Sequence, residues 1–377
     1  MSKSFLKDFS WYFLGSLIPI VIGVLKTPIF TRHFNQEEFG HLGIITVTFS
    51  YLGMILFTWI GTCIWRYHPK FRLNNQLNEL YSNLLFLFGI AFLILFVIVI
   101  IWHSFENNIL MKKLILFSFV HLIFSQLYSY YMIVVRVEGR AVFYTVFQSL
   151  RAILSFITLL TLVFIFKVDI TALILSLVII DFIAILYLFI INPLKVVINF
   201  KLTHKKYLNE LLIYVSTGLL MNVCFLTISS SDRYIISWFG SISDVGIYDQ
   251  VYKISQLSIA AFVTIFFNTI NPSLLNELEH NFENSKYLMR SYLKVFFIYG
   301  FPTIVYISFF AKEISDILLG KEFRIGYNII PFVFFAAFLH GAINFFELRL
   351  KFKDKLKKLS LIMIGATILN IILTIIF

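Results

Sequence analysis

The sequence predicts an all-α, polytopic membrane protein with about eleven transmembrane helices, and three observations support this class. Apolar residues make up 59% of the chain and charged residues only 14%, against about 25% charged in an ordinary globular protein. The apolar residues form runs that are long enough to cross a bilayer, which takes roughly 20 residues. The connections between these runs are short, and most Lys and Arg residues lie in them, as is typical of helices that cross a membrane.

The candidate spans follow one another along the whole chain. The first begins after Lys7, the second ends before Arg66, and the third, from Leu80 to Trp102, contains no formally charged residue. In order, the spans are residues 9–30, 40–64, 80–102, 114–135, 141–166, 170–192, 208–231, 245–270, 288–310, 327–346 and 359–377. The first span starts without the short apolar core and cleavage site of a signal peptide, so we expect no cleavable leader.

The distribution of Lys and Arg predicts that the N-terminus lies in the cytoplasm. With this orientation, the cytoplasmic segments hold nineteen of these residues and the opposite loops hold eight. The largest cytoplasmic group runs from Arg349 to Lys358. Short cytoplasmic loops are enriched in basic residues. Because the formal charge of +11 is spread over such loops, it indicates membrane orientation and no nucleic-acid partner.

Several kinds of chemistry are not supported by the sequence. The two cysteines, Cys63 and Cys224, both lie inside apolar runs, which disfavours a disulfide framework or a metal site. The histidines are scattered, and the chain has no HExxH, Gly-rich phosphate loop or GxSxG motif. No loop exceeds about twenty residues, so no catalytic domain is expected outside the membrane. We therefore expect neither an enzyme nor a cofactor.

An internal repeat predicts two lobes. Glu38-Phe39-Gly40 separates two long apolar runs in the first half, and Asp244-Val245-Gly246 separates two in the second half. Because an even number of spans lies between them, the repeat is parallel, about an axis along the membrane normal. We expect an N-terminal lobe of six helices in residues 1–200 and a C-terminal lobe of five in residues 201–377. The last run reaches Phe377, so the second lobe is expected to be one helix short.

Two groups of motifs resemble a known family. The first group comprises Thr31-Arg32, Glu38-Phe39-Gly40, Gly61 and Arg66-Tyr67. The second comprises Asp232-Arg233-Tyr234-Ile235-Ile236, Val245-Gly246-Ile247-Tyr248, Lys253-Ile254 and Asn271-Pro272. Together they resemble the signatures of Wzx-type polysaccharide biosynthesis flippases, which transport O-antigen and capsule repeats. This family belongs to the multidrug/oligosaccharidyl-lipid/polysaccharide exporter superfamily, and the resemblance covers most of the chain.

The resemblance implies two pseudo-symmetric lobes around a central cavity. It also implies alternating access in a bacterial cytoplasmic membrane, where the cavity moves an undecaprenyl-pyrophosphate-linked oligosaccharide. The implied partners are this lipid-linked oligosaccharide, membrane lipids, and a glycan polymerase with its chain-length machinery. Twelve or fourteen helices are expected in this family, so the predicted eleven depart from its pattern.

Charged residues inside the spans or at their outer ends are the first candidates for substrate binding or gating, because an ionisable group at the bilayer centre costs about 2.5–3.5 kcal/mol. Six lie in the predicted outer half of the membrane: Lys26, Arg32, Asp232, Arg233, Asp249 and Lys253. Asp249 and Lys253 are four residues apart and are expected to pair on one helix face. The group, which is basic overall, contacts an anionic substrate, forms an outer gate, or simply holds helices together; the sequence leaves these three alternatives open.

A second candidate set lies near the predicted midplane. Arg151 and Asp181 are expected to neutralise each other, with substrate binding a further role for Arg151 and ion coupling a further role for Asp181. Arg66, at the cytoplasmic end of the second span, either captures an anionic headgroup or only anchors the helix. Tyr128 and its neighbouring tyrosines are expected to form an interfacial belt.

The leading functional hypothesis is a flippase for a lipid-linked glycan, and three alternatives stay open. A multidrug exporter of the same fold would need surplus carboxylates for its cations, whereas the intramembrane charges here are mainly basic. A membrane-embedded polymerase or O-acyltransferase is less favoured, since polymerases commonly present a large external loop. A scaffold without transport activity would not need six charges in the outer half of the membrane.

Overall fold

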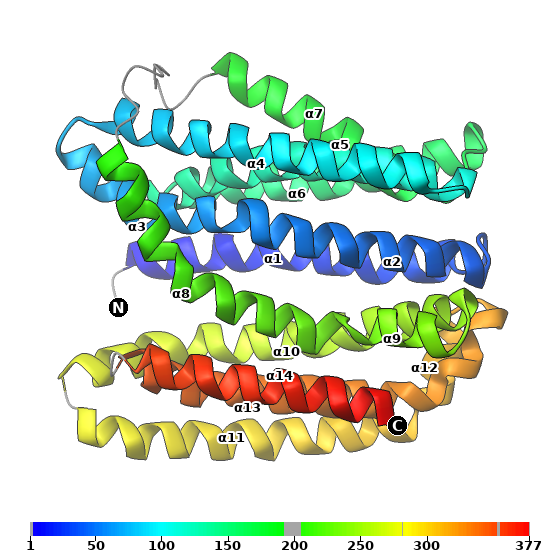
Figure 1. Ribbon diagram of the computed structural model, residues 1–377. Coiled ribbons are helices and arrows are strands. Elements are labelled where there is room, and N and C mark those ends of the chain that lie inside the picture. The colour runs from blue at the N-terminus through cyan, green and yellow to red at the C-terminus, as the bar shows by residue number, and fades with distance from the viewer. Residues whose placement is uncertain (1–2, 192–204, 281, 353–354, 377) are drawn as a thin grey trace. The chain divides into compact units, whose positions relative to one another are not determined.

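The chain folds almost entirely into helices, as predicted. The structure, a computed structural model, describes residues 3–191, 205–280, 282–352 and 355–376 (Figure 1) and contains no strand in these ranges. The first helices are α1 (Lys3–Phe30), α2 (Gln36–Gly53), η1 (Met54–Thr58), α3 (Trp59–Leu73), α4 (Leu77–Phe105), α5 (Ile109–Val137), α6 (Ala141–Leu160), η2 (Thr161–Ile165) and α7 (Ala172–Ile191). They are followed by α8 (Lys205–Ser230), α9 (Asp232–Phe239), α10 (Ile242–His280), α11 (Phe282–Phe309), α12 (Ala311–Leu318), η4 (Lys321–Ile329), α13 (Ile330–Phe352) and α14 (Leu356–Ile376).

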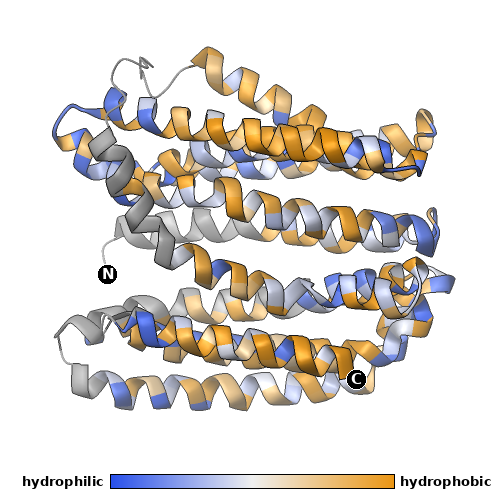
Figure 2. Ribbon diagram, viewed as in Figure 1, coloured by the Kyte–Doolittle hydropathy of each residue, from blue (hydrophilic) through white to orange (hydrophobic). Residues whose placement is uncertain are grey.

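Eight helical segments of the described residues are long and apolar enough to cross a membrane. They coincide with eight of the predicted spans, and α1, α8 and α10 coincide with the other three. Figure 2 shows apolar residues along most of α4, with polar residues gathered at helix ends and in connections. Many large apolar side chains on these helices are exposed, which suits a surface that faces lipid chains and not water.

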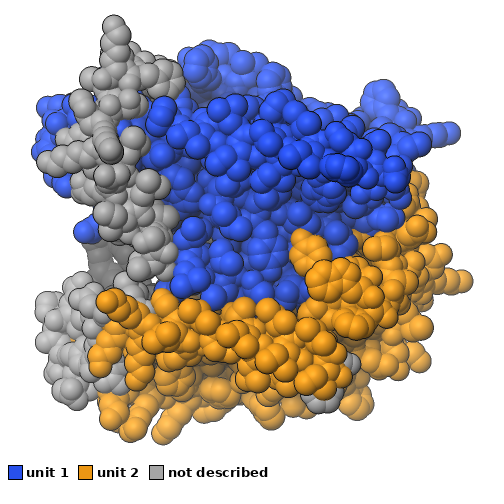
Figure 3. Space-filling model, in the orientation of Figure 1, with its two compact units in different colours: residues 1–22, 41–232 blue, residues 23–40, 233–377 orange. Residues whose placement is uncertain are grey.

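The chain divides into two compact units, which Figure 3 shows in different colours. Unit 1 comprises residues 1–22 and 41–232, and unit 2 comprises residues 23–40 and 233–377. The predicted boundary between lobes, at residues 200 and 201, lies outside the described residues, and the division into lobes stays a prediction.

In unit 1, α5 is the central helix and packs on α3, α4, α6 and α7. A cluster of buried apolar side chains joins α3 to α4 and includes Cys63, Ile64 and Leu80. The short π-helix η1 interrupts the helical hydrogen bonding between α2 and α3, and the Tyr130 hydroxyl donates to the Phe57 carbonyl there at 2.7 Å. The same carbonyl also accepts the backbone N–H of Trp59, so the hydroxyl gives this oxygen a second bond and ties α5 to η1.

In unit 2, α10 packs on α11, α13 and η4. Aromatic rings fill this interface: Phe296 and Phe338 are both fully buried and stack with their centroids 4.6 Å apart. The close approach depends on Gly300, since a Cβ there would lie 2.1 Å from the Phe338 ring.

Residues 23–40, which we call the α1–α2 corner, belong to unit 2 although they lie early in the sequence. Three side chains tie the corner to the segment around η4. The amide of Gly320 donates to Thr31 Oγ1 at 2.9 Å, Arg32 donates to the Ile317 carbonyl at 2.7 Å, and Gln36 donates to the Glu322 carbonyl at 2.5 Å.

The predicted repeat is visible where α2 and α10 begin. Asn35 and Glu38 cap α2 reciprocally, with bonds of 2.9 and 3.0 Å, and Ser241 and Asp244 cap α10 in the same way. These are capping boxes, in which each side chain satisfies the other residue's backbone amide.

The two helix starts also meet at equivalent glycines. A Cβ on Gly40 would lie 1.9 Å from the Ile242 carbonyl oxygen, and a Cβ on Gly246 would lie 1.9 Å from that of Gln36. Gln36 precedes Gly40 by the same number of residues as Ile242 precedes Gly246. Each glycine therefore contacts the equivalent residue of the other helix start, as expected of a two-fold repeat.

Candidate functional site

The predicted pairing of Arg151 with Asp181 is confirmed within unit 1. Arg151 on α6 donates from Nε to Asp181 Oδ1 at 2.5 Å and from Nη2 to Oδ2 at 2.9 Å. The Asp181 side chain on α7 is completely buried. A two-pronged guanidinium–carboxylate contact is the strongest form of such a pair, and it allows both charges to lie inside a helical bundle.

A histidine joins this pair. His121 on α5 places Nε2 3.5 Å from Asp181 Oδ2, and this nitrogen has no hydrogen-bond partner among the described residues. The sequence showed His121 only as one of several scattered histidines. The three residues bring one carboxylate together with two groups that can carry positive charge, and three neighbouring helices are joined at this point.

Arg151 also lies over an aromatic ring. Its guanidinium carbon is 4.8 Å from the centroid of Tyr128 on α5, and the Tyr128 hydroxyl donates to Gln148 Oε1 at 3.1 Å. Tyr128 is only 4% exposed. The expectation that Tyr128 belongs to an interfacial belt is therefore wrong, because its ring and hydroxyl are engaged in the interior of unit 1.

These groups line a polar pocket of about 180 Å³, which we call the arginine pocket. It is lined by Ser125, Tyr128, Ser129, Met132, Ile133, Arg136, Tyr144, Gln148 and Arg151. The guanidinium of Arg136 lies over two rings, 5.1 Å from the centroid of Trp65 and 5.2 Å from that of Tyr144. Two guanidinium groups, hydroxyls and an amide suit an anion with several oxygens, such as a phosphate.

Sequence reasoning missed Arg136 as a site residue and counted it only among the loop charges. A usable signal was present on two helices. Tyr144, Gln148 and Arg151 on α6 follow the spacing of one helix face, and Tyr128 and Arg136 are two turns apart on α5. Polar residues that recur on one face of an apolar span indicate a lined pocket.

In unit 2, the predicted pair of Asp249 and Lys253 is confirmed, at 2.6 Å on successive turns of α10. Arg233 on α9 is buried and approaches Asp249 Oδ1 at 3.4 Å, while Gln250 donates to Asp249 Oδ2 at 3.2 Å. We call these four residues the Asp249 cluster. Two basic side chains share one carboxylate, so the cluster carries one net positive charge.

Two tyrosines hold the arginine of this cluster. The guanidinium carbon of Arg233 is 5.2 Å from the ring centroid of Tyr248 and 4.2 Å from that of Tyr252. Cation–π contacts of this kind gain strength in a site that excludes water. They fix the plane of the guanidinium, so the sequence motif around Asp232 and Val245 has a clear packing role here.

The other predicted residues differ in exposure and in their visible roles. Arg32 is exposed and bonds to backbone carbonyls at the α1–α2 corner, which is a structural task. Arg66 is exposed on α3, and Lys26 is partly buried on α1. Asp232 opens α9, where an acidic residue interacts favourably with the helix dipole. The grouping of Lys26 and Asp232 with the Asp249 cluster stays a prediction.

The described residues include no group of three or more His, Cys, Asp or Glu side chains placed to hold a metal ion. The polar groups of both sites are instead arginine, lysine, tyrosine and amide side chains paired with single carboxylates. This composition suits binding of an anion and not chemistry at a metal.

Comparison with known proteins adds a family and a fold. Residues 5–275 match the family described as "Polysaccharide biosynthesis protein". No protein among those with curated descriptions matches the chain.

Similar solved structures are transporters. An inward-facing multidrug resistance MATE family transporter of the MOP superfamily superimposes with a TM-score of 0.56 at 14% identity, covering 98% of this chain and 85% of that one. An outward-facing structure of such a transporter gives 0.54 at 15% identity, covering 92% and 85%. A MATE structure in complex with MaL6 gives 0.53 at 16%, covering 99% and 85%. At these identities the likeness shows the fold: an all-α, multi-pass transporter fold. With the family, it confirms the prediction of a membrane transporter and not an enzyme.

Proposed function

Since the chain belongs to the polysaccharide biosynthesis protein family, we propose that it moves a polyprenyl-pyrophosphate-linked oligosaccharide across a bacterial cytoplasmic membrane. The arginine pocket is the observation that carries this proposal. A pyrophosphate presents several oxygens with at least two negative charges, and the pocket offers two guanidinium groups, hydroxyls and an amide within one small space.

The charge of the lining favours this substrate over a cationic drug. None of the residues that line the arginine pocket is acidic, whereas a site for cations needs surplus carboxylates. The Asp181 side chain is buried and already bonded twice to Arg151. A multidrug exporter of the same fold is therefore the weaker candidate, although the fold itself accommodates either substrate.

The Asp249 cluster supports the same proposal in unit 2. Its net positive charge would attract an anionic headgroup or acidic sugars in the predicted outer half of the membrane. Asp181, which contacts both Arg151 and His121, stays the candidate for coupling to an ion gradient. Membrane lipids and a glycan polymerase with its chain-length machinery remain the proposed partners.

Transport in reconstituted vesicles tests the proposal. We expect the protein to move a fluorescent polyprenyl-pyrophosphate oligosaccharide across the vesicle bilayer, measured by protection of the label from an impermeant quencher. The Arg136→Gln variant should slow transport about tenfold or more, since it removes hydrogen bonds to a charged group. The double variant Arg151→Gln with Asp181→Asn should do the same while leaving no unpaired buried charge.

Arg290→Gln is the matched control, because it makes the same change at an exposed arginine of α11 outside both sites. It should transport at the native rate. Failure of the native protein to move the labelled lipid, together with transport of a fluorescent organic cation, would replace the flippase proposal with the exporter alternative.

A further inference from the structure

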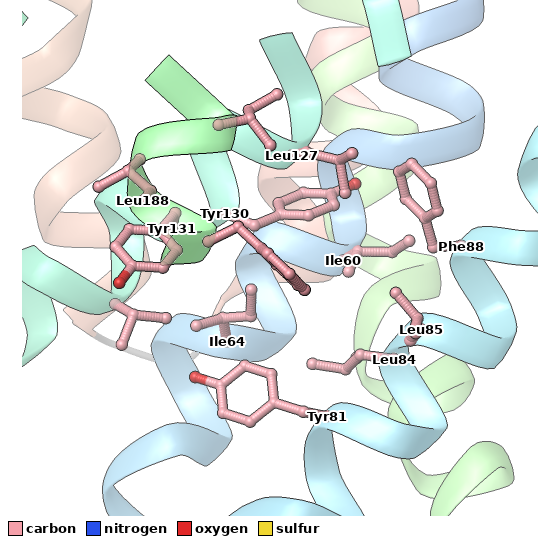
Figure 4. Close-up of a pocket in the computed structure, with 13 residues that line it drawn as sticks. Ile60, Ile64, Tyr81, Leu84, Leu85, Phe88, Leu127, Tyr130, Tyr131 and Leu188 are labelled. Atoms are coloured by element: carbon pink, nitrogen blue, oxygen red, sulfur yellow. The ribbon is translucent and has the colours of Figure 1, made fainter. Parts of the chain in front are cut away.

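Unit 1 contains a second cavity, far more apolar than the arginine pocket. Its volume is about 640 Å³, and small-molecule sites typically measure about 300–1,000 Å³. Figure 4 shows its lining, which α3, α4, α5 and α7 all contribute. We call it the α4–α7 groove. Phe189 on its rim is 80% exposed, so the groove opens onto the surface that the bilayer would cover.

The groove runs along the helices. Its lining extends from Tyr81 to Phe88 on α4 and from Leu127 to Val134 on α5. Seven residues of an α-helix rise about 10 Å. An apolar space of this length and volume has room for part of a hydrocarbon chain that lies parallel to the helices.

One end of the groove is polar. Tyr81 lies near the start of α4 and Tyr131 near the end of α5, and Figure 4 shows both hydroxyls on the same side of the cavity. The Tyr131 hydroxyl oxygen is buried and has no hydrogen-bond partner among the described residues. Leaving a buried hydroxyl unbonded costs about 1–3 kcal/mol, so a ligand atom that accepts this bond would be favoured.

Positive charge surrounds that polar end. The carboxylate of Glu138 is shared by two arginines there, with oxygens 3.9 Å from Arg72 and 3.0 Å from Arg140. Both arginines are about half exposed, and Arg140 interacts electrostatically with Tyr131. His68 connects this group to the groove, because its Nδ1 bonds to the Tyr81 hydroxyl at 2.6 Å. Two arginines against one glutamate leave an excess of positive charge for an anionic headgroup.

We propose that the α4–α7 groove holds one acyl chain of an anionic phospholipid. The chain lies along the groove, an ester or phosphate oxygen accepts the hydrogen bond of Tyr131, and the phosphate faces Arg140 and Arg72. By the predicted orientation, this end of the groove lies in the cytoplasmic leaflet. The site is separate from the arginine pocket, and the proposal does not depend on the transported substrate.

A phospholipid is favoured over the tail of a rare carrier lipid by mass action. The groove is open to the bilayer, and occupancy rises with the concentration of a ligand relative to its dissociation constant. Phospholipid is the bulk component of any membrane that this protein crosses, so it fills an open apolar groove unless the groove strongly prefers another chain.

Native mass spectrometry of the purified protein tests the occupant. Ile185 lines the groove, whereas the next residue, Leu186, is exposed on the same helix outside it. We expect the native protein and the Leu186→Trp variant each to retain one bound phospholipid, and the Ile185→Trp variant to have lost it. The thermal midpoints of both variants should show that each is folded. Equal retention by the two variants, or a polyprenyl phosphate as the retained lipid, would overturn the proposal.

A second arm tests the headgroup end. Delipidated protein is titrated with phosphatidylglycerol and with phosphatidylcholine of identical chains. We expect phosphatidylglycerol to bind more tightly, and Tyr131→Phe to weaken its binding about tenfold, as for loss of a hydrogen bond to a charged group. Equal affinity for the two lipids would contradict an anionic headgroup, and an unchanged affinity in Tyr131→Phe would contradict the assigned hydrogen bond.

Discussion

Asp181 shows what a single ionised residue requires inside a membrane protein. Its side chain is completely buried, and it is bonded twice to Arg151 and approached by His121. Two charges removed from water each lose several kcal/mol of solvation, which a well-aligned pair largely offsets. The pair therefore tolerates burial as a unit, while neither member tolerates it alone.

This coupling leads to a prediction for the pair. Asp181→Ala should lower the free energy of unfolding, by at most about 3–5 kcal/mol, because it leaves the partly buried guanidinium of Arg151 without its carboxylate. The double variant Arg151→Met with Asp181→Leu should recover most of that loss but lose transport. Thermal unfolding in detergent measures the first effect and vesicle transport the second. A double variant as unstable as the single one would show that the pair is not the reason for the loss.

Asp169 lies in the short connection between η2 and α7, outside the spans, and allows a prediction about pH. Burial alone would raise the pKa of Asp169, but hydrogen bonds from Thr171 and Lys113 outweigh this effect, and the pKa is lowered from its ordinary value. A lowered carboxyl pKa stabilises the folded state above the unfolded pKa, about 3.9, and this contribution is lost as the pH falls through the folded value.

Asp169→Asn should therefore lower the free energy of unfolding by about 0.2–1 kcal/mol at pH 7, as for other exposed pairs. The difference in stability between the native protein and the variant should persist at pH values above the ordinary pKa of Asp169. It should vanish at pH values below the lowered pKa of the folded state. Thermal midpoints recorded from pH 7 down to a pH below the lowered pKa measure this difference. A difference that grows as the pH falls would mean that the carboxylate is not the stabilising form.

At the scale of elements, the start of α2 and the start of α10 pack so closely that only glycine fits. A Cβ on Gly40 would meet the Ile242 carbonyl at 1.9 Å, and backbone atoms cannot rotate away as a side chain can. Overpacking a core typically costs about 1–3 kcal/mol. Gly40→Ala should therefore lower the free energy of unfolding by at least that amount. Thermal unfolding measures the loss.

Gly218→Ala is the control for this prediction. Gly218 lies in α8, and among the described residues nothing beyond its own helix backbone comes within 4 Å of its would-be Cβ. Alanine favours helix over glycine by about 0.8–1.0 kcal/mol, so this variant should be neutral or slightly more stable. If both alanine variants behaved alike, the close contact between the two helix starts would be wrong.

The sequence predicted helices better than it predicted neighbours. Run length and loop charge located the spans, and four-residue spacing predicted the Asp249–Lys253 pair. The cluster of Arg136 with Trp65 and Tyr144 was not predicted, because these residues come from three helices. A helix that is apolar on all sides does not reveal which face turns inward. Only tertiary packing decides which polar residues of different helices meet.

For the whole molecule, the predicted topology depends on loop charge alone, and it decides which leaflet each site faces. The connection at residues 74–76 should be cytoplasmic and that at residues 106–108 external, with α4 crossing the membrane between them. Both native cysteines, Cys63 and Cys224, are buried. An impermeant thiol reagent should therefore give little background labelling, and a single new cysteine can report its own side.

Two exposed asparagines in these connections allow a direct measurement. In intact cells, Asn107→Cys should react with an impermeant maleimide, whereas Asn74→Cys should react only after the membrane is permeabilised. The reverse pattern would invert the topology and place the polar end of the α4–α7 groove in the outer leaflet. Labelling of both in intact cells would mean that α4 does not cross. With the predicted pattern, Arg72 and Arg140 at the polar end of the groove lie on the cytoplasmic side. Positive charge in short loops is favoured on that side, and the cytoplasmic leaflet carries the anionic lipids.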